Sequence, residues 1–134
     1  MPKISKDTAP ERMKVRGRSD TAEGELDGYT VNLQGYDVDM DFSWAFKGLP
    51  DDACTASHLG YVIKGKVTAR MVDGTEEVFA GGDALILKPG HTFAVTAGTE
   101  FVTFTPTDEA NATKPVVERN VMAFAAEHGI DLSG

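Results

Sequence analysis

Residues 58–105 decide the fold, and they read HLGYVIKGKVTARMVDGTEEVFAGGDALILKPGHTFAVTAGTEFVTFT. Apolar and polar residues alternate within this stretch, as Val67, Ala69 and Met71 show, and a period of two predicts half-buried β-strands. The strands end at turn formers, and Asp73-Gly74 between two such runs is a strong hairpin signal. The same alternation begins upstream at Tyr29. We expect about eight short strands: Tyr29–Leu33, Val38–Phe46, His58–Lys64, Val67–Met71, Thr75–Phe79, Ala84–Leu87, His91–Thr96 and Phe101–Thr105.

So many short strands in a small chain predict two packed antiparallel sheets or a closed barrel, because open sheet edges and an exposed apolar face are avoided. A jelly roll fits the spacing best. The chain has 134 residues, which is the length of one domain.

The two ends of the chain differ from the middle. Residues 1–18 hold six basic and two acidic side chains, a local charge of +4 on a chain whose formal charge is −8. We expect residues 1–22 to form a basic arm, either a flexible terminus or a segment that docks on an acidic neighbouring subunit. Residues 23–106 then form the barrel, and residues 107–134 form a helix and tail.

A helix is expected near the C-terminus. Thr113-Lys114-Pro115 is typical of a helix start, because proline is tolerated in the first turn, and Gly129 is a plausible residue after the helix end. Four residues at helical spacing lie between them: Val117, Val121, Phe124 and His128. We interpret His128 as structural, since a protonated histidine complements the dipole in the last turn.

Composition narrows the class of protein. The charge of −8 repels nucleic-acid phosphates and anionic lipids alike, so neither is expected as a partner. Cys54 is the single cysteine and cannot form an intrachain disulfide, which favours a reducing compartment. The N-terminus carries charges where a signal peptide needs an apolar segment, and we expect a cytoplasmic protein.

Two segments carry a resemblance to a known family. His58 and Gly65 have the separation at which the first cupin motif places its glutamate and glycine, with Tyr61-Val62-Ile63 between them. The second cupin motif begins with Gly-Asp and turns at Pro-x-Gly before a histidine, and residues 82–91 read GDALILKPGH. On these residues the chain resembles the small single-domain bacterial cupins, which have an RmlC-like jelly roll.

The sequence departs from the cupin pattern in three places. His58 occupies the slot of the glutamate, and the region of the expected His-x-His pair holds Asp51-Asp52-Ala53-Cys54. The asparagine that often closes the second motif is missing. Counted without a gap, the histidine slot of that motif falls on Phe93, whereas a loop two residues shorter places His91 there. We adopt the shorter loop.

The resemblance implies an all-β, cupin-type double-stranded β-helix with one C-terminal α-helix. It also implies a homodimer, because many small cupins pair through their sheets. Cupins include isomerases, dioxygenases, lyases, storage proteins and sugar-binding regulators, so the resemblance supplies no single reaction.

In the cupin arrangement the first-motif ligands lie at the end of one strand and the start of the next. Cys54 and His58 would therefore face each other across a tight turn at 55–57, and His91 would join them from the second motif. A thiolate with two imidazoles suits zinc, or iron, copper or nickel if a coordination position stays open, and manganese is retained for testing. Asp51 or Asp52 could add an oxygen ligand.

Other interpretations of these side chains stand beside the metal site. A lone cysteine is most often a buried apolar side chain, and a barrel histidine can be a neutral hydrogen-bonded group. A nucleophilic Cys54 activated by His58 is a third possibility, but no residue pattern marks an oxyanion hole.

Small barrels of this type hold one ligand. Five apolar residues are candidates for the wall of a ligand pocket, with core packing as the alternative: Met40, Phe42, Trp44, Val62 and Phe93. The predicted function is a small-molecule-binding cupin with a divalent-metal site and possible isomerase, lyase or dioxygenase chemistry. The alternatives are a metal-free binding or sensing cupin and a purely structural jelly roll.

Overall fold

The computed structural model describes residues 2–132, which form ten strands, two 3-10 helices and one α-helix among the described residues. The elements follow one another in this order: β1 (Glu11–Val15), β2 (Ser19–Leu26), β3 (Tyr29–Tyr36), β4 (Met40–Asp41), η1 (Ser43–Phe46), η2 (Pro50–Asp52), β5 (His58–Lys64), β6 (Lys66–Met71), β7 (Glu76–Ala80), β8 (Ala84–Leu87), β9 (His91–Val95), β10 (Thr99–Pro106) and α1 (Thr107–Glu127).

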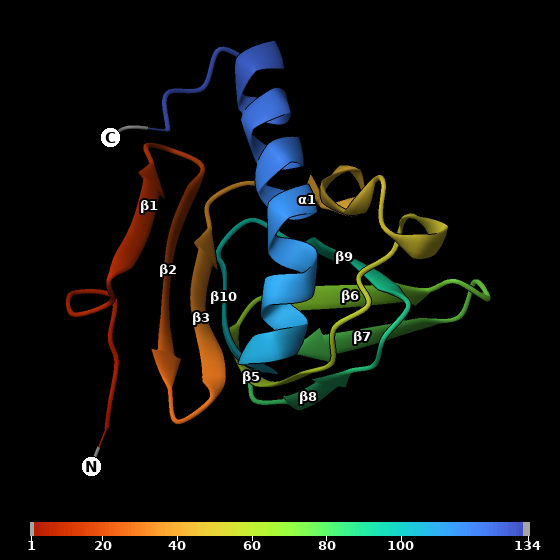
Figure 1. Cartoon of the computed structure of the whole chain (residues 1–134), viewed down its shortest axis with the longest axis horizontal. Helices are drawn as coiled ribbons and strands as arrows, with labels where there is room; N and C mark the ends of the chain where they lie inside the picture. The colour runs from red at the N-terminus through yellow and green to blue at the C-terminus, as the bar shows by residue number, and fades with distance from the viewer. Residues whose placement is uncertain (1, 133–134) are drawn as a thin grey trace.

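The strands form two antiparallel sheets. One sheet has the order β1-β2-β3-β10-β5-β8 and the other β4-β9-β6-β7. Helix α1 follows β10 and lies between the larger sheet and η1, where it contacts η1, β10 and β3 (Figure 1). The prediction of an all-β, two-sheet fold with one C-terminal helix is confirmed. No helix within residues 2–132 has both the length and the apolar character needed to cross a membrane.

The core lies between the two sheets. Val62, Val67 and Phe101 are at most 2% exposed and belong to one cluster that draws on both sheets. Gly65 turns the chain from β5 in one sheet into β6 in the other, with a positive φ of 83°. A side chain at Gly65 would also collide with Thr99, so two independent constraints favour glycine at this corner.

The strand predicted over Val38–Phe46 is wrong for most of its length. Only Met40–Asp41 pairs with β9, and Ser43–Phe46 forms the 3-10 helix η1. The Asp41 side chain starts the turn by accepting a hydrogen bond from the Ser43 N–H at 2.9 Å. The Asn120 amide of α1 then donates to the carbonyls of Ala45 and Lys47, at 2.8 and 2.9 Å, and supplies partners that a sheet would otherwise provide.

Both chain ends also differ from expectation. The segment 1–22, expected as an arm outside the barrel, contributes β1 and half of β2 to the larger sheet. Arg12 fixes this hairpin through hydrogen bonds of 3.0 and 2.8 Å to the Asp20 carboxylate.

Helix α1 begins at Thr107 rather than Thr113, so Pro115 lies inside it. Pro115 removes one helical hydrogen bond, and the carbonyl that loses it belongs to the exposed Asn111.

Candidate metal centre and ligand pocket

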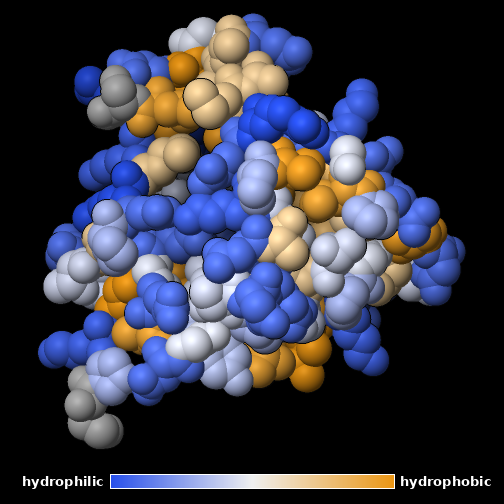
Figure 2. Space-filling view, viewed as in Figure 1, coloured by the Kyte–Doolittle hydropathy of each residue, from blue (hydrophilic) through white to orange (hydrophobic). Residues whose placement is uncertain are grey.

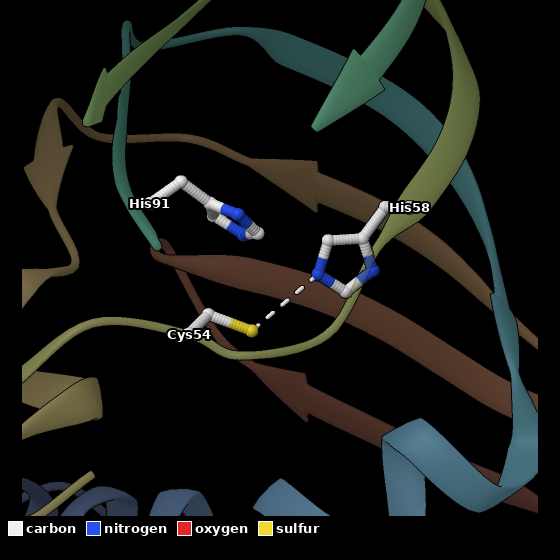
Figure 3. Close-up of side chains that lie close together, drawn as sticks. All are labelled: Cys54, His58 and His91. Atoms are coloured by element: carbon white, nitrogen blue, oxygen red, sulfur yellow. Dashed lines mark hydrogen bonds between the residues drawn. The ribbon is translucent and has the colours of Figure 1, made fainter. Parts of the chain in front are cut away.

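The structure brings the three predicted ligand side chains together. Cys54 pairs with His91 through its backbone, because the Cys54 N–H donates to the His91 carbonyl at 2.8 Å. The Gly90 N–H donates in turn to the Cys54 carbonyl at 2.7 Å. A bend at 55–57 then returns the chain so that His58, the first residue of β5, faces both (Figure 3).

The ligand atoms of Cys54, His58 and His91 all lie within 4.8 Å of one another. The Cys54 Sγ is 3.6 Å from His58 Nε2, and the two imidazole rings lie 5.0 Å apart between centroids (Figure 3). Among residues 2–132 this is the one group of three cysteine, histidine or carboxylate side chains close enough to share a metal ion. Asp51 and Asp52, considered as oxygen donors, are not part of it.

Hydrogen bonds on the outer sides of the rings fix their protonation. His91 Nδ1 donates to the Lys88 carbonyl at 2.6 Å, which leaves Nε2 as the free electron pair. His58 Nδ1 lies 2.5 Å from Thr105 Oγ1. Since the Cys54 thiol can donate to His58 Nε2, the proton of His58 belongs on Nδ1. Both Nε2 atoms therefore present lone pairs to the cluster, and outer partners of this kind orient the histidines of metal sites.

Burial sets the charge of the cluster. His91 is 1% exposed and Cys54 is 3% exposed. The pKa of His58 is lowered to about 4, mainly by burial and also by the neighbouring His91, while Glu109 acts in the opposite direction. Burial also lowers the pKa of His91, against a hydrogen bond to Lys88 that raises it. Both imidazoles are neutral near pH 7, which is the form that binds metals.

The pKa of the Cys54 thiol is raised, mainly by burial and also by the charge of Glu109, while a backbone hydrogen bond to Ala56 acts against the shift. A reactive cysteine nucleophile needs a lowered thiol pKa and a cationic partner. Because His58 is neutral, the cluster lacks both, and the geometry favours ligation over nucleophilic catalysis by Cys54.

Helix α1 holds the loop between two of the ligands. The Glu109 carboxylate accepts hydrogen bonds from the N–H and the hydroxyl of Ser57, at 2.9 and 2.7 Å. These hydrogen bonds and the nearby His58 lower the pKa of Glu109. Since Ser57 precedes His58 directly, this contact ties the position of the imidazole to the first turn of the helix.

A cavity of about 360 Å³ opens onto the cluster, and Cys54, His58 and His91 are part of its lining. Four of the five predicted pocket residues line it as well: Met40, Phe42, Trp44 and Phe93. Val62, predicted as a fifth, does not line the cavity. It is fully buried in the core cluster with Val67 and Phe101, because the space between the sheets is filled with side chains beyond His58 along β5.

Sequence reasoning missed several side chains around the cluster. Thr103 and Thr105 face the cavity from β10, and their alternation with Phe104 could have marked them as inward-facing. Glu109 carried no such signal, because the expected helix began after it.

Comparison with known proteins adds information on the fold. No protein-family model matches the sequence, and no curated protein matches it. A structure of unknown function from Rhizobium leguminosarum bv. viciae is similar, with a TM-score of 0.52, 15% identity, and coverage of 78% of this chain and 95% of that chain. Apo-HppE has a TM-score of 0.51 and 16% identity, over 78% of this chain and 58% of that chain.

An RmlC-like cupin from Shewanella frigidimarina has a TM-score of 0.49 and 21% identity, with coverage of 72% of this chain and 83% of that chain. At these identities the similarity concerns the fold and leaves the reaction open. The chain is an all-β protein of two antiparallel sheets, and it shares this fold with the two structures matched at TM-scores above 0.5.

Proposed function

We propose that Cys54, His58 and His91 bind one divalent transition metal ion, and that the adjoining cavity binds a small molecule beside it. The observation that carries this proposal is the approach of three ligand atoms to within 4.8 Å, with both imidazole Nε2 atoms freed by hydrogen bonds elsewhere. A thiolate and two neutral imidazoles favour zinc, with iron and nickel as further candidates, while manganese prefers oxygen ligands.

Three protein ligands leave a coordination position open, which is the arrangement of catalytic rather than structural zinc sites. A metal ion held there would act as a Lewis acid toward a carbonyl or hydroxyl oxygen of a bound molecule. The protein's own contribution is to keep both imidazoles neutral and to shield the site with Phe42, Trp44 and Phe93. Because burial raises the pKa of the Cys54 thiol, its proton would be released to solvent when the thiolate binds the ion. This chemistry is common to isomerases, lyases and dioxygenases.

Elemental analysis of the purified protein tests the metal site, before and after equilibration with zinc, iron, nickel and manganese. We expect near-stoichiometric metal in the parent chain and a loss of most of it in His91→Ala and Cys54→Ser. His128→Ala is the matched control, because the third histidine lies at the end of α1 and stacks on Phe124 instead. Equal metal in all four proteins, or none in any of them, would overturn the proposal.

A metal-free binding or sensing protein is the second candidate. The observation that favours it is that Cys54 and Thr105 already satisfy both nitrogens of His58 without a metal ion. In this case the double variant His58→Ala/His91→Ala would bind no less small molecule than the parent. Under the metal proposal the same variant loses its metal.

We also propose a homodimer formed through the outer face of the larger sheet. Five large apolar side chains lie exposed on β5, β8 and β10, with exposed fractions between 37% and 60%: Leu59, Tyr61, Ile63, Ile86 and Phe104. Leu59 lies directly opposite both Ile86 and Phe104, so the patch is continuous. At about 200 Å² for each large side chain, it exposes roughly 500 Å², more than half of what one partner buries in a stable interface of ordinary size.

An apolar patch of this kind suits a second copy of the same chain, since a two-fold pairing places the patch against itself. By contrast, the face that carries α1 is mainly hydrophilic, with hydrophobic residues in small separate patches (Figure 2). Light scattering should report a dimer for the parent and a monomer for Tyr61→Glu. Val78→Glu is the control, because Val78 is 55% exposed on the other sheet and should leave the dimer intact. A monomeric parent would refute the pairing.

A further inference from the structure

The inner face of β3 and β10 presents a strip of uncharged polar side chains to the cavity. Asn32, Gln34 and Thr103 all belong to its lining. Asn32 lies directly opposite Thr103 across the β3–β10 pair, and Gln34 follows two residues along on the same face. One more step along β10 is Thr105, which contacts His58, so the strip runs up to the candidate metal centre.

The strip has unused hydrogen-bonding capacity. Within the part of the chain that the structure describes, the side chains of Asn32 and Thr103 make no hydrogen bond, although Thr103 is only 3% exposed. Gln34 accepts one hydrogen bond from the Tyr36 hydroxyl at 2.6 Å, which leaves its amide N–H₂ free to donate. Among residues 2–132 the one buried side-chain nitrogen or oxygen without a hydrogen-bond partner is Trp44 Nε1, which also lines the cavity. The Thr103 hydroxyl therefore reaches the cavity and is open to a hydrogen bond from a bound molecule.

The facing wall has a different character. Phe42 and Phe93 are stacked, with ring centroids 4.8 Å apart and planes at 24°, and Trp44 lies 6.0 Å from Phe42. The charged residues in the lining lie toward β2 and α1, where Lys114 pairs with Glu23 at 3.7 Å. The side chains of the aromatic wall and of the polar strip carry no charge, and the one acidic neighbour of the strip, Glu23 opposite Asn32 on β2, is paired with Lys114.

We infer that the pocket takes an uncharged, ring-containing molecule whose edge carries both a hydrogen-bond donor and an acceptor, such as an amide or a pair of hydroxyls. The ring lies against Phe42 and Phe93, and the polar edge bonds to Asn32, Gln34 and Thr103. The inference extends the proposed function by naming the class of molecule bound beside the metal centre. A carboxylate edge fits less well, because the strip offers it no cation to offset the cost of burial.

Benzamide, benzoate and toluene share one ring and differ in that edge, so they are suitable probes. Trp44 is the only tryptophan, and its indole N–H gives a single signal in a ¹H–¹⁵N correlation spectrum. The change in this signal during titration of the metal-free protein gives a dissociation constant for each probe. The dissociation constant of benzamide should be at least about threefold lower than that of toluene, because hydrogen bonds add to the same ring contact. Benzoate should bind more weakly than benzamide.

Variants of the strip make the test specific. Thr103→Val keeps the shape of the side chain and should weaken benzamide binding about threefold to tenfold, the value of one neutral hydrogen bond, without weakening toluene binding. Asn32→Leu provides a second, less buried site for the same test. Thr92→Val is the control, because Thr92 does not line the cavity.

The outcome of this test is separable from that of the metal proposal. Metal content should be unchanged in Thr103→Val and Asn32→Leu, whereas His91→Ala loses metal and keeps the strip. Toluene binding as tightly as benzamide in the parent, or equal benzamide affinity in the parent and both strip variants, would overturn the inference whatever the metal analysis gives.

Discussion

The acid stability of the metal-free protein should depend strongly on His58. Burial lowers the pKa of His58 to about 4 in the folded chain, from the ordinary value of 6.5. Between these values the unfolded chain binds a proton that the folded chain does not, so the free energy of unfolding falls as the pH decreases from about 6.5 to about 4. The stability that depends on an unprotonated His58 is fully present above about pH 6.5 and is lost below it. The total is about 3 kcal/mol, because one pKa unit corresponds to about 1.4 kcal/mol.

Urea unfolding followed by Trp44 fluorescence measures this effect. By pH 4.5 the parent should have lost about 2.5 kcal/mol through His58. His58→Gln keeps an amide that can hydrogen-bond and does not titrate, so its curve should lack this part of the loss. The titration of His91 and of the carboxylates is common to both proteins and cancels in the difference. Parallel stability curves for parent and variant between about pH 7 and about pH 4.5 would refute the reasoning.

Three further variants test how the site is supported. Thr105→Val removes the outer partner of His58 Nδ1 and should weaken zinc binding about 10- to 100-fold in a chelator competition. Thr68→Val, outside the cavity lining, is the control, and unchanged affinity in Thr105→Val would contradict this expectation. Glu109→Ala frees Ser57 and should weaken zinc binding about tenfold without unfolding the chain. A zinc affinity equal to that of the parent would show that the contact between Glu109 and Ser57 does not position His58. Gly60→Ala should destabilise the chain by about 3 kcal/mol or more in thermal unfolding, because its new methyl group collides with the Val102 carbonyl; a stable variant would disprove the clash.

The sequence reveals the strands whose alternation reflects burial on one face. The motifs in the sequence also lead to Cys54, His58 and His91. The choice of His91 over Phe93 is possible because only the length of one loop between two recognisable strands has to be decided. Phe42, Trp44 and Phe46 could not be assigned in the same way. Their alternation is that of a strand, but the Asp41 turn and the Asn120 amide hold Trp44 and Phe46 in a 3-10 helix that begins directly after Phe42.

Tertiary contacts explain the remaining differences. The strands β1 and β2 begin in a segment whose basic charge suggested an arm, and its pairing with β3 depends on partners that charge does not indicate. Glu109 and Ser57 are 52 residues apart and both polar, so no local pattern connects them. The Thr103 side chain makes no hydrogen bond because of the residues that pack around it in space, and its neighbours in the sequence do not indicate this.

The bond between Glu109 and Ser57 makes the helix and the metal loop a single mechanical unit. Helix α1 also supplies part of the cavity wall, through Val117 and Phe124 among others. If a guest in the cavity displaced α1, we would expect the spacing of Cys54 and His58 to change, and with it the metal affinity of the proposed site. Thermodynamic reciprocity requires that the metal change the affinity for the guest by the same factor. Under the proposed function, a contact at the edge of the site would thus couple the binding of metal and guest, which is heterotropic cooperativity.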